Sequence, residues 1–424
     1  MKLSKNLKHY IASVIAASAV IFSANSFAGA FQLWEQDAGG VGDYHAGGAA
    51  EANTAATIFY NPAGATRLKH PQVSTGAALI GLDVNFSGTA SVMGVPAQVN
   101  NQSGDTTNIV PNFAFALPFA HRWAFAFSMT SPFGLSTEYE NQSYVNLLAT
   151  KTELETINLN PSIAYEINRY LSLGVGFDEL YGQAIYNSDV FAPLKSDLSG
   201  WNHGYNAGLL IQFTKATRVG LSYRSAITVT AKGPSESQNY NVPPVPIDTT
   251  ASANFPLPAT TILSFYHDFN SRFTLMTSAF YTQWSSFKEL IINNIATPTG
   301  PGTVALFENY RNTLNLSIGG KYHFNRHIAL TAGFGHDQTP TRYNYRDIRL
   351  PDADHYAASI GLDIQPKPGF LWSMGWTHFF VPTAQINNTL SNDTSKTTTT
   401  APAIGIGTVD GTVNVFGIQF TCDI

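Results

Sequence analysis

Few side chains in this sequence of 424 residues stand where they could carry out chemistry. The histidines show no metal-ligand spacing such as His-x-x-x-His, and no nucleophile stands beside an evident base, so we expect no metal, cofactor or hydrolytic activity. The single cysteine, Cys422, excludes a disulfide framework. Arg311 is the strongest candidate for binding, since a guanidinium can pair bidentately with a carboxylate.

Arg311 precedes a segment in which apolar residues alternate with small or polar ones. The apolar members are Leu314, Leu316 and Ile318, and the others are Asn315, Ser317 and Gly319. If the apolar side chains face lipid, extending the alternation back places Arg311 on the inner face of a barrel. There it could bind a carboxylate or join a network of lumen charges with residues such as Arg224.

The composition restricts how the chain could enter a membrane. Charged residues make up 12% of the chain, against a usual value of about 25%. Beyond the N-terminus there is no long apolar run, so only a closed barrel could span a bilayer, because lipid cannot satisfy open backbone groups. The formal net charge is -5 and there is no basic block, so nucleic acid is not an expected partner.

The N-terminus has the pattern of a cleaved secretory signal. Three lysines, Lys2, Lys5 and Lys8, precede an apolar run from Ile11 to Phe22, and small residues follow. We predict a signal peptide over 1–28. The alternative, a permanent anchor, would need roughly 18 to 20 apolar residues.

Period-2 alternation recurs along the rest of the chain and predicts fourteen strands. They are 73–86, 107–119, 122–138, 154–166, 171–187, 200–213, 217–232, 254–267, 272–287, 306–324, 327–336, 354–364, 370–381 and 409–420. Their connections alternate between short turns and long polar loops. This arrangement is typical of an all-β outer-membrane barrel with short periplasmic turns, and a soluble sandwich has no reason for two classes of loop.

The segment 29–70 does not read as a strand. It is rich in Gly and Ala and contains a turn at Asn61-Pro62. Small side chains permit close packing inside another structure, so we predict a hatch, or plug, within the lumen of a barrel formed by 71–424.

Several strings, in order and spacing, resemble the FadL-type family of outer-membrane transporters of long-chain fatty acids and other hydrophobic compounds. The strings are Gly29-Ala30-Phe31-Gln32-Leu33, Asn61-Pro62-Ala63, Ser131-Pro132-Phe133-Gly134-Leu135-Ser136-Thr137-Glu138, Leu154-Glu155-Thr156-Ile157-Asn158-Leu159-Asn160, Gly204-Tyr205-Asn206-Ala207-Gly208, Leu221-Ser222-Tyr223-Arg224-Ser225, Tyr281-Thr282-Gln283-Trp284-Ser285-Ser286-Phe287 and Ile348-Arg349-Leu350-Pro351-Asp352. The resemblance runs nearly the length of the mature chain. It implies a fourteen-stranded barrel closed by an N-terminal hatch.

The resemblance also implies roles for individual residues. Phe31 would contact ligand from the hatch or pack the hatch against the wall, and Arg311 falls at a basic ligand-binding position of the family. The second basic position falls on Gln183, which brings no charge, although simple alternation points this residue outward. Asn61, Pro62 and Ala63 would belong to the architecture of the hatch.

The stretch Ser131-Pro132-Phe133-Gly134 predicts a kink inside the third strand. Proline removes a ladder donor and glycine loosens the backbone. In the family, the corresponding strand bends inward and opens the barrel wall, so that ligand leaves sideways into the membrane. An ordinary bulge near the rim is the alternative.

Together these features predict an outer-membrane protein of a Gram-negative bacterium for passive uptake of long-chain fatty acids. External loops would capture the ligand, an internal site would bind it, and the third strand would release it. Uptake of aromatic or other neutral hydrocarbons is the alternative, and a porin and an outer-membrane enzyme are less consistent with the sequence. The external loops would permit a role as an adhesin or phage receptor alongside transport. We expect a monomer, with membrane lipid, lipopolysaccharide and the barrel-assembly machinery as partners.

Overall fold

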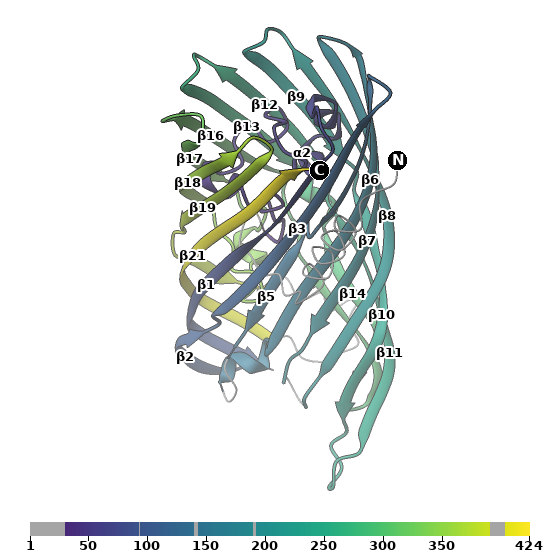
Figure 1. Ribbon diagram of the computed structural model, residues 1–424. Coiled ribbons are helices and arrows are strands. Elements are labelled where there is room, and N and C mark those ends of the chain that lie inside the picture. Colours follow the sequence, from purple (N-terminus) through teal and green to yellow (C-terminus); the bar gives the residue numbers. More distant parts are fainter. Residues whose placement is uncertain (1–29, 93, 140–142, 190–191, 391–402) are drawn as a thin grey trace.

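The chain forms a closed antiparallel barrel of fourteen strands in the computed structural model (Figure 1). The structure describes residues 30–92, 94–139, 143–189, 192–390 and 403–424. The predicted signal peptide, 1–28, lies outside the described residues. The first and last strands close the barrel, with pairs from Gln72–Asp423 through Val92–Ala403.

Most barrel strands are continuous, and the others are divided in two. The continuous ones are β1 (Gln72–Val92), β3 (Thr106–Phe119), β6 (Lys151–Asn168), β7 (Leu171–Tyr186), β8 (Lys195–Gln212), β17 (Ile328–Asp337), β18 (His355–Lys367), β19 (Phe370–Phe380) and β21 (Ala403–Asp423). The divided ones are β4 (Trp123–Thr130) with β5 (Gly134–Glu138), β9 (Thr217–Arg224) with β10 (Ile227–Gln238), β12 (Thr260–Asp268) with β11 (Pro246–Leu257), β13 (Phe273–Thr282) with β14 (Glu289–Thr297), and β16 (Thr313–His323) with β15 (Gly300–Phe307). Two shorter strands, β2 (Val95–Ser103) and β20 (Ala384–Asn387), pair with β1 and β21. Each predicted strand overlaps one of these barrel strands.

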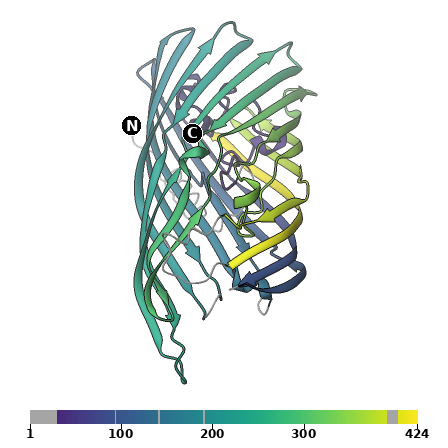
Figure 2. The same cartoon turned by 180° about the vertical axis from the view of Figure 1, so that it is seen from behind.

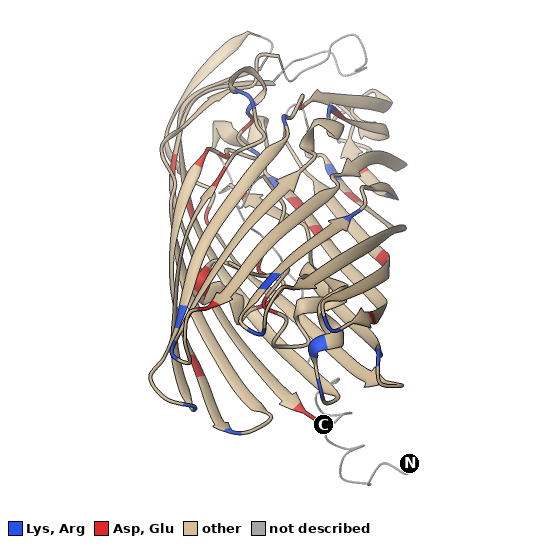
Figure 3. Ribbon diagram, turned by 90° about the horizontal axis from the view of Figure 1, so that it is seen from above, with Lys and Arg blue, Asp and Glu red and all other residues tan. Residues whose placement is uncertain are grey.

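Apolar and polar side chains alternate between the outer and inner faces of the barrel strands, as predicted. In β16, Asn315 and Ser317 are buried, whereas Leu316 and Ile318 are half-exposed on the outer face. Because lipid surrounds the outside and polar groups line the inside, this pattern fixes the register of the strand. Long stretches of strand carry no charged residue (Figure 3), in keeping with the low charge of the sequence.

The two ends of the barrel differ. Short turns at 213–216, 269–272 and 324–327 join strands at one end, which we assign to the periplasm. At the opposite end the β10–β11 hairpin projects well beyond the other strands (Figure 2). Among the described residues, no helix is long and apolar enough to cross a membrane.

The N-terminal residues from Ala30 to Leu68, which we call the N-terminal segment, lie inside the barrel (Figures 1 and 2). The segment contains three short helices, η1 (Gly40–Asp43), α2 (Thr57–Tyr60) and η2 (Pro62–Arg67). The other short helices are η3 (Tyr144–Leu147), η4 (Trp284–Ser286) and η5 (Tyr343–Tyr345). Most side chains of the segment are buried, and its backbone is hydrogen-bonded to inward-facing strand residues, as in the 3.1 Å bond from Ala49 N to Ser264 Oγ.

Inward-facing glycines make room for the N-terminal segment. A Cβ at Gly220 would lie 1.8 Å from the carbonyl oxygen of Ala49, and one at Gly208 would lie 2.0 Å from Asn61 Oδ1. A Cβ at Gly174 would similarly lie 2.4 Å from the backbone nitrogen of Ala63. The alternating glycines of these strands therefore have a steric reason, because the backbone of the segment runs directly against them.

Candidate functional site

The third barrel strand is interrupted where the sequence predicted a kink. β4 ends at Thr130, opposite Asn158 of β6, and β5 resumes at Gly134, opposite Glu155. The four residue steps from Thr130 to Gly134 therefore lie opposite only three steps of β6, from Asn158 to Glu155. The third barrel strand thus contains one extra residue here, which defines a β-bulge. Pro132 lies within it and donates no ladder hydrogen bond.

The neighbouring strand β3 does not follow β5 across this kink. Its pairing with β4 reaches only as far as Phe113 opposite Met129, and the β3 residues beyond that point pair with β1. The edge of the kink is instead occupied by the N-terminal segment. Leu33 N donates to Pro132 O and Gly134 N donates to Phe31 O, both at 2.9 Å.

Two side chains satisfy the remaining backbone groups of the kink, and sequence reasoning missed both. The amide of Gln36 donates to Ser131 O and accepts from Ser131 N, each at 2.7 Å. The hydroxyl of Thr156 donates to Phe133 O at 2.6 Å and accepts from Phe133 N at 3.0 Å. Buried backbone groups need such partners, and a polar residue opposite a predicted proline kink is the signal that could have indicated Thr156.

A large apolar cavity lies on the side of Phe31 that faces the external loops. Its empty space, including the part open to solvent, is about 760 Å³. Its lining comprises Phe31, Leu135, Thr152, Glu153, Leu154, Ala184, Ile185, Tyr186, Leu198, Ala253, Phe255, Phe287, Leu290, Ile292, Leu306, Glu308, Tyr310, Arg349 and Leu350. Phe31 stacks edge-on against Trp284 and Phe287, with ring centroids 4.6 and 5.7 Å apart, and so forms the floor of the cavity.

Arg349 brings the positive charge to this lining. Its side chain is about nine-tenths buried, and its guanidinium carbon lies 4.1 Å from the centre of the Tyr186 ring. Nη1 donates to Thr152 Oγ1 at 2.7 Å, Nη2 donates to Leu148 O, and Nε lies 3.9 Å from Asp347 Oδ1. Because a guanidinium carries five N–H groups, hydrogen bonds to a ligand remain available.

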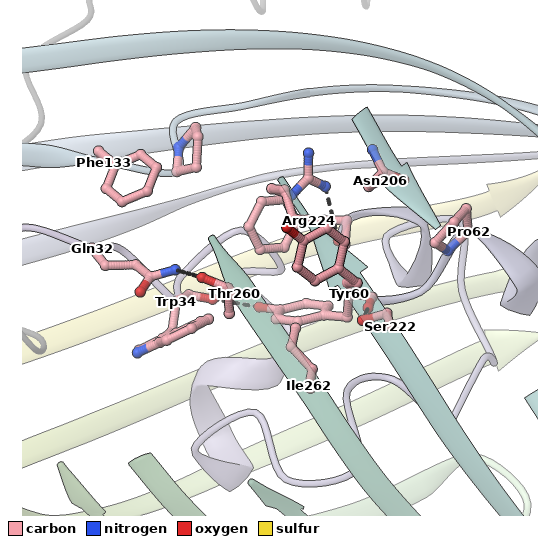
Figure 4. A pocket seen from close by; sticks show the side chains of 13 residues that line it. Gln32, Trp34, Tyr60, Pro62, Phe133, Asn206, Ser222, Arg224, Thr260 and Ile262 are labelled. Carbon is pink, nitrogen blue, oxygen red and sulfur yellow. Dashed lines mark hydrogen bonds between the residues drawn. The ribbon is translucent and has the colours of Figure 1, made fainter. Parts of the chain in front are cut away.

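A smaller cavity lies beside the kink and is lined in part by Pro132 and Phe133 (Figure 4). Aromatic residues of the N-terminal segment line it with Pro132, and Gln32 Nε2 donates to Thr260 Oγ1 at 2.9 Å. Arg224 enters it from β9 and pairs with the buried carboxylate of Asp178. Asp178 also accepts hydrogen bonds from three asparagine amides, those of Asn158, Asn160 and Asn206. This charge is therefore fully compensated within the wall.

Two predicted binding residues lie away from the large cavity. β16 begins only at Thr313, so the alternation does not extend back to Arg311. The Arg311 side chain is 48% exposed and pairs with Asp354 at 3.2 Å, with Nε donating to Thr339 O. Gln183 faces outward in β7, as alternation indicated, and donates to Asp197 at 2.8 Å. Among the described residues, neither Arg311 nor Gln183 is part of the lining of this cavity, and their roles in ligand binding stay predictions.

The Asn61-Pro62-Ala63 turn fixes the N-terminal segment to the wall. Asn61 Nδ2 donates to Ala49 O at 2.7 Å and to Leu209 O at 3.0 Å, while Oδ1 accepts from Ala63 N at 3.0 Å. Asn61 thus caps η2, with Pro62 at its first position, and links the segment to β8. Within the described part of the chain, no group of His, Cys, Asp or Glu side chains is placed to hold a metal ion.

Comparisons with known proteins agree with this architecture. A family model described as outer membrane protein transport protein (OMPP1/FadL/TodX) matches residues 19–423. A long-chain fatty acid transport protein of Escherichia coli is 29% identical over 393 residues, covering 82% of this chain and 86% of its own. Outer membrane protein P1 of Haemophilus influenzae is 27% identical over 421 residues, covering 88% and 90%.

Solved structures show the same fold. A Pseudomonas aeruginosa FadL homologue superposes with a TM-score of 0.81 at 22% identity, covering 93% of this chain and 99% of that one. The toluene transporter TbuX of Ralstonia pickettii superposes with a TM-score of 0.70 at 17% identity, covering 91% and 98%. At these identities the likeness establishes the barrel and leaves the ligand open.

Proposed function

Because this chain belongs to the outer membrane protein transport protein family of OMPP1, FadL and TodX, we propose that it takes up long-chain fatty acids by passive passage. It is an outer-membrane transporter of hydrophobic compounds in a Gram-negative bacterium. The fatty acid is supported by the names of relatives at 28–29% identity over most of the chain. The predicted hatch corresponds to the N-terminal segment, which we propose closes the lumen to water-soluble solutes. We expect the protein to act as a monomer inserted by the barrel-assembly machinery.

The observation that carries the proposal is the guanidinium of Arg349 in the lining of a mostly apolar cavity. A fatty acid needs a long apolar space for its tail and a convergent polar group for its carboxylate. A charge-assisted hydrogen bond contributes about 1.5–3 kcal/mol when the partner is buried. Arg349 therefore takes the role that the sequence assigned to Arg311.

The exit that we propose runs sideways through the kink between β3 and β5. An apolar molecule gains nothing by entering water, whereas release into the bilayer keeps its tail buried. The support is that the pairing of β3 with β4 stops before the kink and that backbone groups of the N-terminal segment bond to Pro132 and Gly134 there. Movement of residues 31–36 would uncover this edge, and the trigger for that movement would be ligand contact with Phe31.

Binding of oleate and of toluene to the detergent-purified mature protein tests the substrate. In Arg349→Ala the affinity for oleate should fall about 10- to 100-fold, since each 1.4 kcal/mol is about tenfold, and the affinity for toluene should not change. Arg311→Ala is the matched control and should bind oleate as the wild type does, because Arg311 lies outside the cavity.

The contrary results are equally clear. Preference for toluene, with no effect of Arg349→Ala on any ligand, would move the protein to the aromatic hydrocarbon alternative, which the TbuX-like fold also accommodates. Loss of oleate binding in Arg311→Ala instead would restore the site expected from the sequence.

A further inference from the structure

A carboxyl group lines the same cavity as Arg349. Glu308 follows β15 directly, and its neighbours in the cavity lining include Phe287, Leu306 and Leu350. A side-chain hydrogen bond joins it to Tyr310. An acidic side chain in a cavity proposed to take fatty acids is unexpected, because two carboxylates at one apolar site repel each other.

The charges that face Glu308 come from several elements. Asp347 and Arg349, in the loop between β17 and β18, act on it with opposite signs. Tyr186 of β7 interacts with both of them as well as with Glu308. Glu153 of β6 also lines the cavity, but its carboxylate is paired with Lys151 at 2.7 Å.

The balance of these groups leaves Glu308 hard to ionise. The pKa of Glu308 is raised from its ordinary value of 4.5 to about 8, chiefly by removal from water and secondly by Asp347, while Tyr310 and Arg349 act in the opposite direction. Near neutral pH the carboxyl therefore carries its proton and can donate a hydrogen bond. Carboxyl groups kept neutral by an apolar site act as donors in this way in other proteins.

We propose that Glu308 is a specificity-determining residue of this cavity, which donates its proton in a hydrogen bond to the carboxylate of the bound fatty acid beside Arg349. The inference rests on the proposed function and adds the chemistry by which the head group is held. Ligand and Glu308 together then carry one negative charge instead of two, beside the guanidinium of Arg349.

The proton balance of binding follows directly. When Glu308 is protonated, the ionised ligand binds without any exchange of protons with solvent. When Glu308 is ionised, binding brings two carboxylates together, and the complex takes up one proton from water. The affinity for a carboxylate should therefore fall about tenfold for each pH unit above the point where free Glu308 ionises. A neutral amphiphile should show no such slope.

The test compares three ligands with the same tail, each used below the concentration at which it forms micelles. They are laurate, dodecane sulfonate, which is charged at every pH used, and dodecanol, which is neutral. Titrations run from pH 6.5 to 9.5 on wild type and on Glu308→Gln, which keeps a donor but cannot ionise. Glu236→Gln, an exposed glutamate of β10, is the matched control.

For wild type and the control we expect the affinity for both anions to fall about tenfold from pH 8.5 to 9.5, with dodecanol unchanged. Glu308→Gln should bind both anions with the same affinity across the range. Equal pH slopes in wild type and Glu308→Gln, or no slope in wild type, would overturn the inference while leaving fatty acid binding intact. Binding of dodecanol alone, at every pH, would overturn the proposed function as well.

Discussion

Gly220 offers a direct way to disturb the N-terminal segment from the barrel wall. It faces inward from β9, and a Cβ added there would meet the backbone of Ala49, with the carbonyl oxygen 1.8 Å and the carbonyl carbon 2.4 Å away. These atoms cannot rotate aside as a flexible side chain would. The same carbonyl oxygen accepts a 2.7 Å hydrogen bond from Asn61 Nδ2, so it is held from the other side.

The magnitude follows from what must move. Overpacking by one methyl group against fixed backbone costs about 1–3 kcal/mol, and the loss of the Asn61 hydrogen bond adds about 1 kcal/mol. The next two carbonyl groups, those of Ala50 and Glu51, accept 2.7 Å hydrogen bonds from Arg218 and would be drawn away with Ala49. We therefore expect Gly220→Ala to destabilise the docked position of the N-terminal segment by about 2–4 kcal/mol. The fraction of molecules in which the segment is displaced from this position should then rise about 30- to 1000-fold.

Ion conductance across planar lipid bilayers measures this displacement, because we propose that the N-terminal segment closes the lumen. Gly220→Ala should conduct more than wild type, with an unchanged β-sheet circular dichroism spectrum to show that the barrel remains folded. Gly81→Ala is the matched control, since its added Cβ would lie 3.9 Å from the nearest atom, an ordinary contact. If both variants conduct as wild type does, the argument that this glycine accommodates the segment is refuted.

Two further perturbations address the exit and the buried charge. Deletion of Pro132 removes the extra residue of the bulge, so β5 should align with β3 and close the wall. We expect cells with this deletion to lose oleate uptake while the purified protein still binds oleate, whereas Pro132→Ala, which keeps the residue count, should retain uptake. Normal uptake by the deletion variant would argue against the sideways exit. Burial raises the pKa of Glu35 in the N-terminal segment from 4.5 to about 7, so the folded state holds a proton that the unfolded state releases, and the stability present below pH 4.5 is lost as the pH rises to 7. The free energy of unfolding of Glu35→Gln, measured by thermal unfolding, should therefore equal that of wild type at pH 4.5 and exceed it by about 3 kcal/mol at pH 8. An equal difference between the two proteins at both pH values would contradict this account.

The sequence predicted those parts of the molecule that local periodicity controls. Alternation over ten or more residues located each barrel strand, since every second side chain must suit lipid. The same alternation correctly turned Gln183 outward. The kink at Ser131–Gly134 was predictable because proline and glycine act through their own backbone.

The rest depended on contacts between residues far apart in the chain. Arg311 was extrapolated from the pattern of β16, but the strand begins two residues later and periodicity ends there. Arg349 lies in a loop without periodicity, and its place in the cavity is set by bonds to Leu148 and Thr152, about 200 residues earlier. The pairing of Gln36 with Ser131 likewise joins segments 95 residues apart, and no local signal encodes it.

The seam between β1 and β21 has a consequence for how the molecule is built. These strands pair along their whole length and so close the wall of the barrel around the N-terminal segment. The N-terminal segment precedes β21 in the chain and is therefore synthesised before it. We expect the segment to be enclosed before the seam forms, so that topology sets the order of events during assembly. A change that delays the docking of Asn61 on β8 should leave barrels that close with the segment outside, even when the finished protein would be stable.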